Sequence, residues 1–185
     1  MADTKAAPLE YRIGDTVVEP TLGICCIEGV RKMTIDGVEE IFYIFESGSA
    51  KVMVPRSQLP KRGIRKPMSR EEVKRVFVML KQPVSPVRGD ARTQYLSYRE
   101  ILKSGNPLKI AKLLRDLYTL DQADELKGKE KEIMEQAKKF LVDEITYVRQ
   151  IPKTRAMDEV TDNLRQMYKR KITKDKTSVK KAAQP

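Results

Sequence analysis

The chain contains no histidine and no tryptophan, and its only two cysteines are adjacent, Cys25 and Cys26. Without histidine the usual proton-transfer group near neutral pH is missing, and a cysteine nucleophile has no imidazole to activate it. Zinc sites need about four spaced nitrogen or sulfur ligands, which two neighbouring cysteines cannot supply. We therefore expect a protein with no catalytic residues, no metal and no cofactor.

The cysteine pair lies in the segment "ICCIEGV", which is typical of a β-strand. Adjacent residues of an extended chain point to opposite faces, so the two thiols are not expected to share a pocket. Free cysteine commonly behaves as a small hydrophobic residue, which favours packing; redox sensing is the alternative. Reduced thiols without a disulfide framework favour a cytoplasmic protein.

Long apolar runs are also absent. No segment approaches the roughly 20 apolar residues that cross a bilayer, and "MADTKAAPLEY" lacks the apolar part of a signal peptide. We expect a soluble protein without a membrane partner.

Positive charge, in contrast, is in excess, with 37 Lys and Arg against 26 Asp and Glu and a net charge of +11. Such an excess favours an anionic partner such as nucleic acid. It is densest in residues 169–185, "KRKITKDKTSVKKAAQP", where seven basic residues face one acidic residue. We predict that this tail is unfolded and serves either as a solubilising end or as an arm that touches nucleic acid.

Up to about residue 66 the patterns predict strands and turns. The short runs "TVVEP", "ICCIEGV", "EEIFYIF" and "AKVMVP" are rich in β-branched or aromatic residues and are separated by glycines. Asp36 and Gly37 predict a tight hairpin between two of them. The segment is expected to form a small, strongly bent sheet or barrel.

After "PKRGIRKP" the apolar period becomes helical. Ser69 and Glu72 predict a capping box for a first helix that ends before Pro83, and Asp90 and Asn106 are expected to cap the next two. A fourth helix is predicted from about residue 129 to 149, and a fifth amphipathic helix past Pro152. The apolar residues of this fifth helix are Met157, Val160, Leu164 and Met167.

Five segments in this order resemble the CarD/CdnL family of bacterial transcription regulators: "IGDTVVEPTLGICCIEGV", "AKVMVP", "GIRKPMSREEVKRVFVMLK", "ILKSGNPLKIAKLLRDLYTL" and "LKGKEKEIMEQAKKFLVDEI". The N-terminal module of that family is shared with the transcription-repair coupling factor. The resemblance covers about residues 11–148. It implies an α+β protein with a small Tudor-like β barrel in residues 1–66 and an all-α helical bundle in residues 67–150. Residues 151–185 would add the amphipathic helix and the disordered basic tail.

The resemblance implies that the barrel binds the β subunit of RNA polymerase and that the helical domain touches promoter DNA at the upstream edge of the transcription bubble. An exposed strand edge suits the first role, because main-chain groups give affinity whatever the side chains. Many relatives have an arginine where this chain has Met53, so the contact there is expected to be apolar. The residues expected to bind polymerase are Ile41, Tyr43, Lys51, Val52, Met53, Val54 and Pro55.

The DNA-facing part departs from the family. Relatives carry a tryptophan-led "W-x-R-R-Y" motif where this chain reads "ARTQY", so Ala91 replaces the stacking side chain and Thr93 an arginine. Stacking on an unpaired base contributes roughly 1–3 kcal/mol, which alanine cannot supply. Lys131 matches a DNA-facing lysine of the family. Arg92, Arg99 and Lys103 fall within about 40° of one another on their helix, forming either a solvated side or a phosphate-binding ridge.

The function expected from these features is that of a monomeric, non-catalytic regulator. It would bind RNA polymerase through its β module, contact promoter DNA weakly through phosphates, and modulate open-complex formation or stability. The alternative is a polymerase-bound adaptor that recruits another protein through its helices, including Met157 to Met167. A basic protein associated with RNA or ribosomes is a third hypothesis, and an enzyme is the least favoured.

Overall fold

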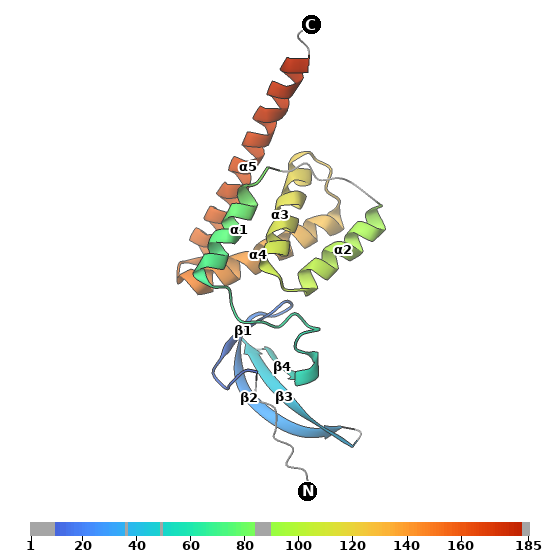
Figure 1. The fold of residues 1–185 in the computed structure, drawn as a ribbon, viewed down its shortest axis with the longest axis vertical. Helices are drawn as coiled ribbons and strands as arrows, with labels where there is room; N and C mark the ends of the chain where they lie inside the picture. Colours follow the sequence, from blue (N-terminus) through green and yellow to red (C-terminus); the bar gives the residue numbers. More distant parts are fainter. Residues whose placement is uncertain (1–9, 36, 49, 84–89, 183–185) are drawn as a thin grey trace.

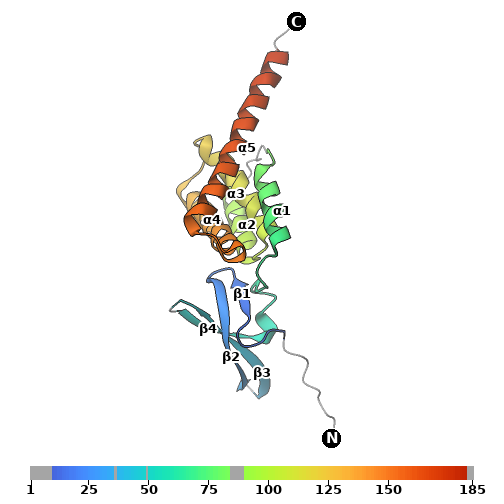
Figure 2. The ribbon, with the colours of Figure 1, turned by 90° about the vertical axis from the view of Figure 1, so that its left-hand side faces the viewer.

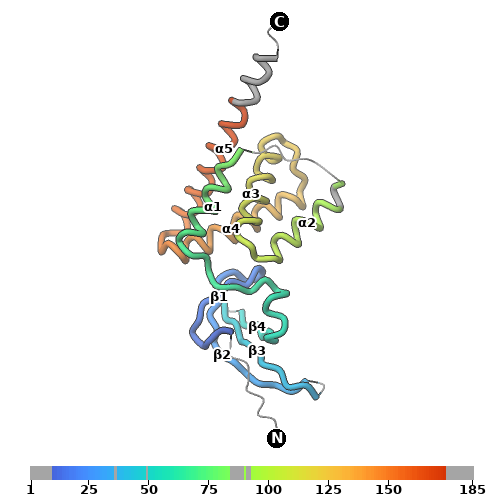
Figure 3. Tube along the Cα trace, viewed as in Figure 1, coloured from blue at the N-terminus to red at the C-terminus, as the bar shows by residue number. Residues whose placement is uncertain are grey.

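The computed structural model describes residues 10–35, 37–48, 50–83 and 90–182, and the side chains of all of these except 91, 92 and 174–182. A curled antiparallel sheet forms one end of the molecule, and a group of helices forms the other (Figures 1 and 2). The Cα trace passes from the sheet into the helices through residues 59–69 (Figure 3). The predicted α+β architecture, a Tudor-like β module followed by helices, is confirmed.

The sheet has the order β1-β2-β3-β4, with β1 at Thr16–Glu19, β2 at Gly23–Ile35, β3 at Val38–Ser47 and β4 at Ala50–Pro55. A short 3-10 helix, η1 (Arg56–Gln58), follows β4. Ile35 pairs with Val38, so two residues connect β2 to β3, as a tight hairpin requires. Gly37 has a φ of +79°, which glycine adopts without strain. Asp36 lies outside the described residues.

The core of the β module is made by the inward side chains of β1 to β4 and by Leu59 beyond η1. Cys25 is buried in this core and Cys26 is exposed, which confirms that the two thiols point to opposite faces. Loss of water around the buried thiol, and next the charge of Glu19, raise the pKa of Cys25 to about 11. A bulge between Ile27 and Gly29 shifts the register and bends β2.

The first three helices begin where their capping residues predict. Ser69 and Glu72 make both hydrogen bonds of the capping box, the Asp90 carboxylate accepts from Thr93 N–H, and Asn106 caps the third helix. The helices are α1 (Arg70–Lys81), α2 (Ala91–Lys103), α3 (Pro107–Gln122), α4 (Gly128–Arg149) and α5 (Lys153–Ala182). No helix in the described part of the chain is long and apolar enough to span a membrane.

Two predictions about the segment that forms helix α5 were wrong. Its buried side is formed by Ala156, Val160, Leu164 and Met167, spaced by three or four residues, whereas Met157 lies one position off this line and is 40% exposed. The helix also continues to Ala182, so the segment from residue 169 to 182 is helical and not unfolded. It contains no glycine or proline, and extending a helix that is already packed is far easier than starting one.

Candidate functional site

Strand β4 is an edge of the sheet. Among the described residues it pairs with β3 alone, from Phe42–Pro55 to Ser47–Ala50. The opposite edge is different, because Val18 of β1 exchanges two main-chain hydrogen bonds with Arg65, at 2.8 and 3.2 Å. The outer side of β4 therefore offers main-chain donors and acceptors to an added strand.

The side chains of β4 alternate between two faces. Val54 is fully buried in the core, whereas Met53 is 42% exposed on the outer face of the sheet. Gly29 of β2, Ile44 of β3 and Met53 are register partners and form one row across the three strands. A Cβ atom at Gly29 would lie 3.3 Å from Cδ1 of Ile44, so the glycine leaves room for the isoleucine side chain.

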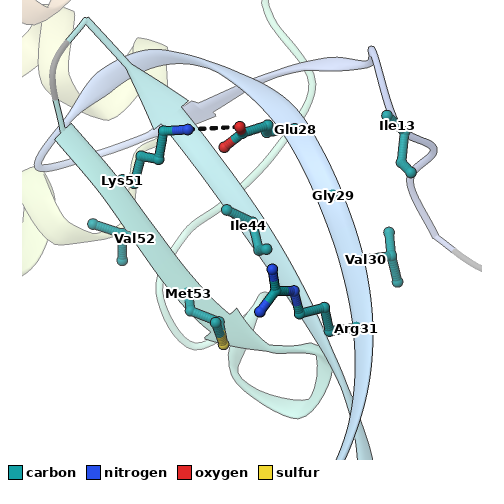
Figure 4. Close-up of a pocket in the computed structure, with 9 residues that line it drawn as sticks. All are labelled: Ile13, Glu28, Gly29, Val30, Arg31, Ile44, Lys51, Val52 and Met53. Atoms are coloured by element: carbon teal, nitrogen blue, oxygen red, sulfur yellow. Dashed lines mark hydrogen bonds and ion pairs between the residues drawn. The ribbon is translucent and has the colours of Figure 1, made fainter.

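This row forms the floor of an open hollow of about 460 Å³ (Figure 4). At one end Lys51 Nζ lies 2.6 Å from Glu28 Oε1, and this hydrogen bond raises the pKa of Lys51. At the other end the side chains of Arg31, Ile44 and Met53 gather in Figure 4. The full lining is Ile13, Glu28, Gly29, Val30, Arg31, Ile44, Lys51, Val52 and Met53.

The apolar surface continues beyond the hollow onto the β2–β3 hairpin. Residues two apart in a strand share a face, as do register partners, so Met33, Ile35 and Val38 lie on the same face as Ile44 and Met53. The three hairpin residues are exposed. An exposed apolar patch of this kind marks an interaction surface more often than a scattered hydrophobic residue does.

The residues predicted to bind polymerase divide into two groups. Lys51, Val52 and Met53 line the hollow. The side chains of Tyr43 and Val54 are fully buried in the core, and that of Ile41 packs against it. Pro55 is half-buried at the end of β4.

The hollow also contains residues that sequence reasoning missed: Ile13, Glu28, Gly29, Val30, Arg31 and Ile44. They belong to β2, to β3 and to the segment before β1, so only the strand register brings them beside β4. Gly29 within the predicted strand "ICCIEGV" was the available signal, because an isolated glycine in a strand often marks a bulge.

The predicted DNA-binding cations lie on α2 and α4. Arg99 is exposed. Lys103 Nζ forms an ion pair with Glu100 Oε1 at 3.1 Å, and Lys131 Nζ forms one with Asp121 Oδ1 at 3.7 Å. The side chain of Arg92 lies outside the described residues. Exposed ion pairs contribute little to stability, so phosphate can replace these acidic partners.

Comparison with known proteins gives the family. Residues 11–68 match the model of the CarD-like/TRCF RID domain, and residues 75–161 match the CarD C-terminal domain. The chain belongs to the CarD family. It is also 22% identical over 143 residues to a Bacillus subtilis (strain 168) protein named "Putative transcription factor YdeB", an alignment that covers 76% of this chain and 94% of that protein. The family is one of CarD-like transcription factors, in agreement with the resemblance seen in the sequence.

Proposed function

We propose that this CarD-family protein is a non-catalytic transcription regulator that binds the β subunit of RNA polymerase along β4 and modulates promoter opening. The observation that carries the proposal is the β4 edge, which pairs on one side only within the described residues and lies beside the open hollow. A strand of the partner added to this edge would gain main-chain hydrogen bonds along its length. The side chains of Val52 and Met53 would then be covered.

The chemistry of the hollow supports a mixed apolar and cationic contact. Met53 and Ile44 provide apolar surface beside the edge, and Arg31 has no ion pair among the described residues. Arg31 therefore supplies a cation close to the place where many relatives have an arginine and this chain has Met53. A partner segment that combines an apolar residue with a carboxylate fits this surface best.

The helical domain would act on promoter DNA through phosphates. Arg92, Arg99, Lys103 and Lys131 are the proposed contacts, and the basic end of α5 adds charge. Each contact is weak, but a domain held on polymerase meets the promoter at a high effective concentration. Because phosphate contacts release counterions, DNA affinity should fall steeply with salt, and truncation after Met167 should reduce both the affinity and its salt slope.

Two measurements test the proposal. Purified protein should bind RNA polymerase and an isolated β-subunit fragment, and it should change the footprint of polymerase at the upstream edge of the bubble on promoter DNA. Recovery of ribosomes without polymerase would contradict the proposal. Polymerase binding with an unchanged footprint would favour the adaptor alternative, in which the helices recruit another protein.

A further inference from the structure

Arg65 belongs to the β module by its main chain. Val18 N–H donates to Arg65 O at 2.8 Å, and Arg65 N–H donates to Val18 O at 3.2 Å. These two bonds attach Arg65 to β1 in the manner of a short added strand. The position of its Cα therefore moves with the sheet.

The side chain of Arg65 belongs instead to the helical domain. Its two Nη atoms donate to the two carboxylate oxygens of Glu144 on α4, both at 2.7 Å, and its Nε donates to Gly105 O, before α3, at 2.7 Å. The guanidinium also lies 5.9 Å from the centre of the Phe140 ring. Glu144 is only 1% exposed and accepts a further bond from Met68 N–H at 2.7 Å. One residue thus joins β1, α4 and the α2–α3 connection.

Two loops pack backbone to backbone beside this pair. A Cβ atom on Gly63 would lie 2.5 Å from Lys103 O, and one on Gly105 would lie 2.7 Å from Gly63 O and 3.0 Å from Pro20 Cγ. Both glycines have positive φ, at +67° and +61°. Since no side chain fits between them, the two domains touch at one close distance.

We propose that Arg65 and Glu144 are positioning residues that fix the angle between the β module and the helical domain, and that the effect on promoter opening depends on this angle. The proposal rests on the proposed function. Docking along β4 fixes only the β module on polymerase, so the helices reach a defined place on DNA only if the joint is rigid. A bidentate, buried ion pair is suited to making the joint rigid, because its two parallel hydrogen bonds fix the relative orientation of the two side chains. Such a pair often adds little net stability.

The angle can be measured in the free protein. Cys26 is exposed while Cys25 is buried, so a spin label attaches selectively at Cys26, and Gln166→Cys places a second label on the exposed side of α5. Pulsed electron resonance should give a narrow distance distribution for the wild type. Arg65→Gln and Glu144→Gln should broaden or shift it.

The matched control is Arg62→Gln. Arg62 Nη2 lies 3.3 Å from Oε1 of Glu19, which is also buried, but both residues belong to the β module. This variant should leave the distance distribution unchanged. Glu144→Gln nearly preserves shape and keeps the test valid if Arg65→Gln does not fold, and Gly63→Ala disturbs the same joint without changing a charge.

The functional readout separates binding from action. The joint variants should bind polymerase like the wild type but lose about fivefold or more of its effect on open-complex lifetime, the low end of usual coupling between sites. Unchanged distances would overturn the joint, and changed distances with an unchanged promoter effect would overturn its role. Polymerase binding lost in parallel would make Arg65 a stabilising residue of the β module only. If wild type itself does not bind polymerase, the proposed function and the role in promoter opening fail, while the distances still decide whether the joint exists.

Discussion

The outer face of the β module and the apolar side of α5 have similar side chains but opposite surroundings. Met33, Ile35 and Met53 are exposed on the outer face of the sheet, whereas Leu164 and Met167 are buried against the other helices. From the sequence, Met53 on the first surface and the segment Met157 to Met167 on the second were candidates for partner binding. The structure leaves the first available and uses the second to close the helical core.

This difference bears on the adaptor alternative, since both hypotheses bind polymerase through the β module. Among the described residues, nothing has to unfold to expose the outer side of β4. An adaptor built on the apolar side of α5 would first have to remove Val160, Leu164 and Met167 from the bundle, which costs the free energy of that packing. The first two of the four predictions below test the contrast between the exposed and the buried surface, and all four are given in order of decreasing effect.

The largest effect is expected at Leu164. Leu164→Ala leaves a cavity in the helical core, and such changes cost about 2–5 kcal/mol of unfolding free energy. Met157→Ala is the control on the same helix, because Met157 is 40% exposed and surface changes usually stay within about 0.5 kcal/mol. Urea unfolding followed by circular dichroism measures both. Equal losses would mean that α5 does not pack as described.

The exposed face should respond through binding and not through stability. Met53→Glu places a carboxylate that must lose its water on docking, so polymerase affinity should fall by about 2 kcal/mol, or about thirtyfold. Arg31 nearby can neutralise part of this charge, so adding Arg31→Ala should weaken binding further. Met157→Glu is the matched control, since Met157 is 40% exposed, much like Met53, but lies on α5 and outside the hollow. A titration of labelled protein with polymerase gives the affinities, and equal losses at Met157 and Met53 would place the docking surface elsewhere.

Local signals predicted the elements of this fold well. The capping box at Ser69, the Asp90 and Asn106 caps and the two-residue hairpin all depend on a few neighbouring residues, and each occurs where the sequence places it. The hollow could not be predicted in the same way. It depends on how three strands pair, and the bulge after Ile27 changes which residues of β2 lie beside Ile44.

The local sequence pattern also could not predict which side chains of the strands are buried. The run "EIFYIF" is apolar on both faces, so alternation alone does not say that Tyr43 points into the core and Ile44 out of it. The joint at Arg65 joins residues 79 positions apart in the sequence, and an arginine in a basic segment gives no sign of a buried partner.

An intermediate effect is expected at the start of α2. Ala91 stands where relatives have the tryptophan that wedges against the opened fork, and restoring it by Ala91→Trp should add about 1–3 kcal/mol of stacking on an unpaired base. Open-complex lifetime should rise by about fivefold or more, with little change in binding to closed duplex DNA. Decay of heparin-challenged open complexes measures the lifetime. If the wild type already prolongs the complex as much as the variant, another side chain acts as the wedge, and Tyr95 or Leu96 would be the first to replace.

The smallest effect is expected at the cysteine pair, which lies in the β module but outside the hollow. If Cys25 and Cys26 only pack, replacing both by valine or alanine should keep polymerase affinity within about tenfold, or about 1.4 kcal/mol.

Thiol labelling at pH 8 gives a companion test. The thiolate is the reactive form, and burial raises the pKa of Cys25 to about 11, so Cys25 stays protonated at pH 8 and only the exposed Cys26 should react in the folded protein. Mass spectrometry should count one label on the native chain and two after denaturation. Two labels on the native chain would show that the sheet opens around Cys25, and loss of polymerase binding in a folded double variant would give the pair a role beyond packing.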